Sequence, residues 1–153
     1  MVKSRYEKYV VREPMHPDPG LYQGGMVPTR FLEATLGTMK ESDTMLEFAW
    51  IDKDWFAGMS TERGPHEHNF DEIFLFLGTN REDSNDLGAE VEFWMGGGEE
   101  TEIIKINTSS LIFVPGGVIH LPMFFKNVKK PMLVVVIGLN VGEMKVIRYP
   151  VRG

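Results

Sequence analysis

Three histidines and one glutamate stand at spacings that suit a metal site. His66 and His68 are two residues apart, so in an extended segment both imidazoles leave the same face of one strand. Glu72 has the same parity and begins an apolar run, and after a short bend its carboxylate can return to that face. A third imidazole, His120, follows the turn-forming residues Pro115-Gly-Gly117 and enters another β segment. Together these groups can hold one divalent ion and leave positions open for a substrate or dioxygen.

The composition restricts this metal chemistry to imidazole and carboxylate ligands. The 153 residues include no cysteine, which excludes thiolate nucleophiles, disulfides, iron-sulfur clusters and cysteine zinc sites. Fe, Mn, Ni, Cu and Zn all accept mixed histidine and carboxylate ligands, so we expect one divalent metal ion and do not assign the element. A chain of this length can fold without a structural metal, and the predicted ion therefore serves function.

The charge balance and the lack of long apolar segments narrow the partners. With 16 Lys and Arg against 22 Asp and Glu, the net charge is -6, which opposes binding to nucleic acid or to an anionic membrane. We therefore expect a small-molecule ligand or a protein partner. No apolar stretch has the length of a signal peptide core or of a membrane span, which predicts a cytoplasmic protein.

Short apolar runs separated by turn residues predict the elements that position the ligands. From Thr44 onward these runs recur at intervals typical of an all-β sandwich or barrel, and Gly, Pro, Asn, Asp and Ser occupy the breaks. Residues 30–39 have helical spacing on one side but contain Gly37 and β-branched neighbours, so we assign them no element. The predicted strands are residues 45–51, 72–77, 89–94, 102–106, 111–114, 123–125, 132–139 and 145–149.

One domain accounts for residues 1–153, with an N-terminal arm over residues 1–43 and a β-barrel core over residues 44–150. Residues 14–28 are rich in Pro and Gly, which is typical of an ordered arm or a long loop. Three predicted strands, residues 73–77, 111–114 and 133–137, are apolar on both faces, so a second sheet, the arm or another subunit should cover the outer face. We expect a homodimer that buries a sheet face.

The two histidine segments resemble the two signature motifs of the cupin superfamily, in the family's order. The resemblance implies an all-β fold, the double-stranded β-helix or jelly-roll barrel. It also implies that both histidines and the glutamate of the first motif, with the histidine of the second, bind one metal ion. The motifs are His66-x-His68-xxx-Glu72-xxxxx-Gly78 and Pro115-x-Gly117-xx-His120.

Four positions depart from the usual motifs, and none is a ligand position. Ser60 and Ser109 stand where the two motifs usually open with glycine. The closing glycine of the first motif comes one residue early, at Gly78, and Phe124 stands where the second motif usually ends with asparagine. The exchange at Phe124 predicts a pocket that is more apolar than usual.

The resemblance implies a metal-dependent enzyme that acts on a small organic molecule in the mouth of the barrel. Dioxygenase-like oxidation is the leading reaction, and isomerase or lyase chemistry with the metal as Lewis acid is the close alternative. A module that only binds a small ligand is a further alternative, because fold does not imply function. A structural protein in which the ion only holds strands together is the last alternative. No separate general base is assigned.

Four side chains are predicted to line the substrate pocket. Met123 and Phe124 follow His120 closely, and the parity of Phe124 matches that of the ligands. Arg63 precedes the ligand strand, and its guanidinium can bind a substrate carboxylate through two hydrogen bonds. Trp94 is a candidate pocket wall, although aromatic residues in a small barrel mostly serve packing.

Several neighbouring residues receive structural interpretations. Glu67 and Asp71 have the parity opposite to the ligands and should face solvent, with orientation of a ligand imidazole as the alternative for Asp71. Phe74 and Phe76 are predicted to belong to the core, and Pro122 to share the face of the ligands. His16 is predicted to be solvated in the arm, and Lys126, Lys129 and Lys130 to lie in a solvent-exposed turn. Arg30, Trp50 and Tyr22 are further candidates for the pocket.

Overall fold

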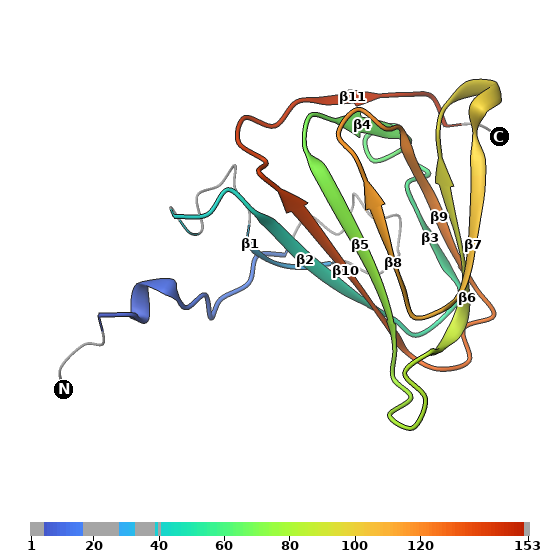
Figure 1. Cartoon of the computed structure of the whole chain (residues 1–153), viewed down its shortest axis with the longest axis horizontal. Coiled ribbons are helices and arrows are strands. Elements are labelled where there is room, and N and C mark those ends of the chain that lie inside the picture. Colours follow the sequence, from blue (N-terminus) through green and yellow to red (C-terminus); the bar gives the residue numbers. More distant parts are fainter. Residues whose placement is uncertain (1–4, 17–27, 33–38, 40, 152–153) are drawn as a thin grey trace.

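Two antiparallel sheets face each other and enclose the core of the molecule (Figure 1). The structure is a computed structural model that describes residues 5–16, 28–32, 39 and 41–151. The first sheet has the strand order β1 (Thr29–Leu32), β2 (Met45–Ile51), β10 (Met132–Leu139), β5 (Asp71–Gly78), β8 (Ser110–Val114). The second has the order β11 (Val146–Arg148), β4 (His66–His68), β9 (His120–Lys126), β6 (Asp86–Met95), β7 (Glu102–Thr108), and β3 (Trp55–Ala57) also pairs with β9. Short 3-10 helices form at Glu7–Tyr9 (η1) and Gly98–Glu100 (η4).

This architecture confirms the predicted fold class, an all-β jelly-roll barrel. Each predicted strand corresponds to an observed one, and β2 and β10 have the predicted bounds. The other predicted strands differ from the observed ones only at their ends. Strands β1, β3 and β4 are additional, because three or four residues carry too little periodicity to reveal a strand. Figure 1 shows β4 and β11 together at one end of the barrel, at the top of the view.

Aromatic side chains from the two sheets meet in the core. Phe74 and Phe76 of β5 are buried, as predicted, and so is Phe93 of β6 in the facing sheet. The ring centroids of Phe74 and Phe93 lie 4.8 Å apart, with their planes at 62°, an edge-to-face arrangement that aromatic pairs favour. Each ring contributes roughly 1.5–3 kcal/mol by burial. The contact holds the two sheets together next to the histidines.

The region predicted as an N-terminal arm contributes a strand to the first sheet. Thr29–Leu32 pairs with β2, and backbone hydrogen bonds join Arg30 and Met15 in both directions, at 2.8 and 3.0 Å. Residues 30–39, which received no element, begin in this strand, but residues 33–38 lie outside the described part of the chain. Tyr22 lies outside it as well. Helix η1 extends away from the barrel (Figure 1).

The first sheet is apolar on its outer face as well as on its inner one. Strand β8 buries Ile112 and Val114, whereas Leu111 and Phe113, on its outer side, are 55% and 47% exposed. The described residues therefore leave part of this apolar face in contact with solvent. No helix in the same part of the chain is long and apolar enough to cross a membrane.

Candidate metal centre

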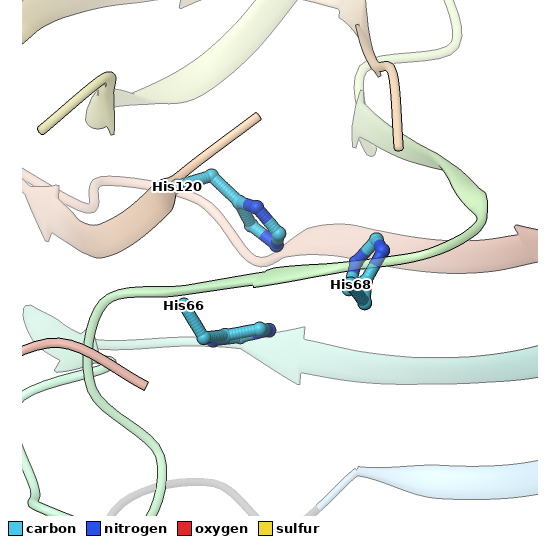
Figure 2. A group of neighbouring side chains, drawn as sticks. All are labelled: His66, His68 and His120. Atoms are coloured by element: carbon cyan, nitrogen blue, oxygen red, sulfur yellow. The ribbon is translucent and has the colours of Figure 1, made fainter. Parts of the chain in front are cut away.

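Two strands of the second sheet bring the three motif histidines together. His66 and His68 lie on β4 with one residue between them, so their side chains leave the same face. His120 begins β9 directly opposite His66. Figure 2 shows the three imidazole rings turned toward one another, and their ligand nitrogens all lie within 4.8 Å of each other. The structure thus groups the three predicted imidazole ligands.

The turn that delivers His120 is hydrogen-bonded to the first motif. The backbone N–H of Gly117 donates to the carbonyl of His68 at 2.8 Å, and the N–H of Gly116 donates to Oδ1 of Asp71 at 2.9 Å. Gly117 has a φ of +82°, which favours glycine at this position. Asp71 lies at the start of β5 and holds the turn through its carboxylate. The two motifs therefore form one connected unit.

Backbone carbonyls determine the tautomer of each imidazole. The Nδ1 atoms of His66, His68 and His120 lie 2.9, 2.8 and 3.0 Å from the carbonyl oxygens of Gly64, Phe70 and Val118. A carbonyl only accepts, so each Nδ1 carries the proton and donates it. In a neutral ring Nε2 then keeps its lone pair for a metal ion, a common arrangement for metal-binding histidines.

Nε2 of His120 supplies a further test of fit. It is fully buried and, although Oε2 of Glu72 lies 3.1 Å away, it forms no hydrogen bond with any described residue. A buried polar atom without a partner costs about 1–3 kcal/mol, and a metal ion between the three Nε2 atoms would satisfy it. The donor set and its surroundings therefore fit a divalent metal ion.

Glu72 adds a negative charge beside the imidazoles. Its side chain is buried, and Oε2 lies 3.1 Å from Nε2 of both His68 and His120. Burial by itself raises the pKa of Glu72, but the contacts with His120 and His68 outweigh burial and lower the pKa to about 2. The carboxylate is therefore ionised near neutral pH and can balance the charge of a bound cation. Its role as the fourth ligand stays a prediction.

His66 is held in the neutral form that a metal requires. Burial, and after it the adjacent His120, lower the pKa of His66 to about 4. A ring with this pKa is unprotonated near pH 7, so its Nε2 can coordinate without first losing a proton.

A cavity of about 500 Å³ opens in front of the centre and is lined by His66, His68, Glu72 and His120. This volume lies in the usual range for small-molecule sites. Most of its wall is apolar, with Met123 among the lining residues, and Arg63 lies at the same cavity. Two of the four predicted pocket residues thus line the space next to the histidines.

Trp94 and Phe124 are not among the described residues that line this cavity. Phe124 is paired with Glu92 of β6 and with Phe56 of β3. The ring centroids of Phe124 and Trp94 lie 6.0 Å apart, and Trp94 lines a separate hollow of about 480 Å³. The prediction that Phe124 faces the cavity because it shares the parity of the ligands was wrong, since the pairing of β9 with β6 shifts between Phe93 and Met95.

The backbone at Leu121 accounts for this shift. Its φ of +71° breaks the regular alternation that was counted from His120. As a result Met123 and Phe125 face the cavity, while Pro122 lines the separate hollow.

The remaining predicted residues divide between the cavity wall and the surface. Arg30 lines the cavity and pairs with Glu47, Nε to Oε2 at 2.8 Å. Glu67 accepts a hydrogen bond from the hydroxyl of Tyr149 at 3.1 Å, and Trp50 is 47% exposed. His16 is exposed, as are Lys126, Lys129 and Lys130.

Two residues that the sequence interpretation did not select contact or approach the centre. The ring of Phe70 stacks on His68, with centroids 3.8 Å apart and planes at 4°. Arg148 lines the cavity and pairs with His66 across β11 and β4. The alternation of Val146, Ile147 and Arg148 along β11 was the available signal, since the first and third share one face.

The fold and the histidine cluster together define a cupin-fold protein, which confirms the resemblance of the two motifs. Vicilin from Corylus avellana (hazelnut) is similar with a TM-score of 0.56 and 11% identity over 89% of this chain. The 7S globulin from Momordica charantia is similar with a TM-score of 0.52 and 10% identity over 88% of it. The chain spans about a third of these two proteins, 34% and 35% of their lengths.

A Streptomyces PAC13 variant, solved with uridine, is similar over nearly the whole of both chains. The alignment covers 98% of this chain and 94% of PAC13, with 12% identity and a TM-score of 0.50. At such identities the likeness to these solved structures shows the fold alone. The chain matches no protein-family model and no curated protein.

Proposed function

We propose that the protein is a metal-dependent enzyme that acts on a small organic molecule in the barrel cavity, with dioxygenase-like oxidation as its leading reaction. The observation that carries this proposal is the arrangement of three imidazoles whose Nδ1 atoms are held by carbonyls and whose Nε2 atoms meet at the cavity wall. His66, His68 and His120 would hold the ion, with Glu72 as the proposed fourth ligand. Fe, Mn, Ni, Cu and Zn all suit these ligands.

A divalent ion bound here would supply Lewis acidity, and a redox-active one would also allow reaction with dioxygen. The chain itself holds the imidazole ligands in fixed positions and provides an apolar cavity wall. Carbonyl groups hold the imidazole rings in one orientation, and Phe70 restrains His68 by stacking on it. Apolar side chains such as Ile51, Val134 and Phe74 line the cavity and exclude water from a bound substrate.

The cavity wall also bears on the alternatives to oxidation. Among the described lining residues, the carboxylates besides Glu72 are Glu47, which is paired with Arg30, and Glu62. Glu62 is exposed, and no contact among the described residues holds its carboxylate against the centre. Isomerase or lyase chemistry would therefore depend on the Lewis acidity of the ion, and a module that binds a ligand without turnover stays the non-catalytic alternative.

Elemental analysis of the purified protein and its variants tests the centre. We expect about one divalent ion per chain in the wild type and its loss in His66→Ala and His120→Ala. His16→Ala is the matched control, because His16 is exposed in the N-terminal region, and it should keep the ion. Retention of the metal by both centre variants would contradict the proposed site.

Oxygen uptake distinguishes the reaction classes. Protein reconstituted separately with Fe, Mn, Ni, Cu or Zn is offered small carboxylic acids, phenols and amines in an oxygen-electrode cell. We expect substrate-dependent oxygen consumption with at least one redox-active ion and none with His120→Ala. Equal turnover under argon would overturn the oxidation and favour isomerase or lyase chemistry. Saturable binding without turnover in either atmosphere would favour the non-catalytic module.

A further inference from the structure

Strand β11 places a cationic side chain next to the histidine cluster. Arg148 is paired with His66, and Val146 with His68. Residues paired across two strands point to the same face, and both Arg148 and Val146 line the cavity. Ile147, between them, is 56% exposed, and Arg148 is itself exposed, so it lies at the open side of the cavity. The register of this one strand pair therefore places Arg148 at the cavity, on the strand next to two of the candidate metal ligands.

The guanidinium of Arg148 is anchored without being neutralised. Its Nε donates to the backbone carbonyl of Glu62 at 2.7 Å, which occupies one of five N–H donors. Among the described residues no carboxylate forms an ion pair with Arg148, whereas Arg30 in the same cavity is paired with Glu47. Arg148 thus keeps its charge and a planar edge of donors, which matches the two oxygens of a carboxylate.

We propose that the cavity takes a small monocarboxylate with an apolar body, and that Arg148 binds its carboxylate. This inference rests on the proposed function, since it names the substrate class of the same site. The apolar wall, which includes Met45, Ile51 and Val136, accommodates the body of the molecule.

Calorimetric titration of the metal-replete protein tests this assignment. The probes are hexanoate, octanoate and 3-phenylpropanoate, each compared with its neutral primary amide. We expect at least one acid to bind ~10-fold more tightly than its amide, because the carboxylate forms charge-assisted hydrogen bonds with the guanidinium. Arg148→Gln should remove this preference without weakening the amide, and Arg148→Lys should retain part of it. Arg81→Gln, in the exposed β5–β6 loop, is the matched control and should bind as the wild type does.

Two results would overturn the carboxylate site: binding of none of the acids at millimolar concentration, or an unchanged preference in Arg148→Gln. Metal content and oxygen uptake are measured on the same samples, so the two proposals fail separately. Acid binding without turnover keeps the carboxylate site and removes the enzymatic proposal. Turnover of neutral molecules without binding of any acid keeps the enzymatic proposal and removes the carboxylate site.

A second inference concerns the outer face of the first sheet. Strands β2, β10, β5 and β8 are neighbours in that sheet, and their outward positions form one continuous apolar surface. Four of its members keep a third or more of their area exposed, namely Trp50, Leu77, Leu111 and Phe113. The surface consists of Leu46, Phe48, Trp50, Ile73, Leu75, Leu77, Leu111, Phe113, Leu133, Val135 and Ile137.

The structure assigns this apolar surface to a second copy of the chain. At about 4.8 Å between strands and 3.3 Å per residue, four strands of five to eight residues cover roughly 400 Å² in projection. A stable interface buries ~800 Å² per partner, so a dimer would have to cover the whole of this surface and residues at its edges. The chain carries a net charge of -6, so two copies approach most easily through a face without charges. A twofold axis through the surface pairs it with itself.

Sedimentation equilibrium of the whole chain at micromolar concentration tests the dimer. We expect twice the monomer mass for the wild type and the monomer mass for Phe113→Lys and for Leu111→Lys, whose exposed side chains should tolerate lysine in the folded monomer. Ile103→Lys is the matched control, because Ile103 is 46% exposed on β7 of the other sheet, and it should stay dimeric. A monomeric wild type, or folded lysine variants that remain dimeric, would refute this interface.

Discussion

At the scale of single residues, the centre depends on which nitrogen of each imidazole carries the proton. Carbonyl groups fix Nδ1 as the donor in all three rings. The contacts of Glu72 with two of the Nε2 atoms then add a negative charge where a cation would sit. The neutral ring of His66 and the ionised carboxylate of Glu72 therefore lie in one buried space, and the protonation of these two groups depends on folding.

Metal-free protein should lose stability between pH 6.5 and pH 4 because of His66. Its ordinary pKa is 6.5, whereas burial and the neighbouring His120 lower the pKa in the folded chain to about 4. The unfolded chain gains the proton first as the pH falls, so this contribution is complete above pH 6.5 and is lost through the window. At about 1.4 kcal/mol per pH unit, the loss is on the order of 3 kcal/mol. Urea unfolding of chelator-treated protein at several pH values measures it.

The comparison of variants isolates His66 from the other histidines. His66→Gln removes the buried titrating group, so its free energy of unfolding should fall less than that of the wild type across the same window. His16→Gln should follow the wild-type curve, because His16 is exposed. Glu72 titrates in a lower window, between 4.5 and about 2. Identical slopes for His66→Gln and wild type would contradict the burial of a neutral imidazole.

At the scale of elements, the site depends on hydrogen bonds between two distant segments. The loop after β8 is held by Asp71 through Gly116 and by the carbonyl of His68 through Gly117. Because His120 follows this loop directly, any loosening of the loop moves one ligand relative to the other two. Asp71 is therefore a positioning residue for the loop. The alternative predicted for it, orientation of a ligand imidazole, is not what the structure shows, because the Nδ1 atoms of the three rings bond to backbone carbonyls.

Asp71→Ala should weaken metal binding without abolishing the fold. Loss of the hydrogen bond to Gly116 frees the loop, and removal of groups that orient ligands typically costs 10–100-fold in affinity; we expect about 10-fold. Asp71→Asn keeps an acceptor oxygen and should restore most of the affinity. Competition with a chromogenic chelator measures the dissociation constant, and Glu90→Ala, an exposed change on β6, serves as control. Equal affinities in Asp71→Ala and wild type would exclude this role.

The long apolar runs and the motif histidines could be predicted from the sequence, whereas breaks in alternation could not. Strands β2 and β10 were predicted to the residue, because seven or eight consecutive strand-forming residues leave little ambiguity. Phe124 was misplaced because one left-handed residue, Leu121, changes the parity of everything after it.

Tertiary pairing also hid contacts between positions far apart in the chain. Arg148 was missed because its neighbour across the strand, His66, is 82 positions away in sequence. Two departures from the family motifs meet in the structure, where the N–H of Gly78 donates to Oγ of Ser109 at 3.2 Å. Neither contact can be predicted from the residues that are adjacent in the sequence.

At the scale of the whole molecule, the metal and the core make separate contributions to stability. The core of facing sheets, with side chains such as Phe76, Phe93 and Phe125 almost fully buried, does not depend on the ion. Binding of a metal only to the folded chain adds stability by mass action, about 3–4 kcal/mol when the free metal is 100–1,000 times its dissociation constant. The barrel should therefore stay folded after metal removal and become less resistant to heat.

Chelation should lower the melting temperature by roughly 10 °C, since 1 kcal/mol corresponds to about 2–4 °C for a chain of this size. Calorimetry with and without a chelator measures the shift, and far-ultraviolet circular dichroism at 25 °C should show the same β structure in both samples. His120→Ala removes one ligand, so its melting temperature should not respond to added metal, whereas His16→Ala should respond as the wild type does. Complete unfolding on chelation would instead identify the ion as the element that pins the strands. A response that persists in His120→Ala would place the stabilising metal elsewhere in the chain.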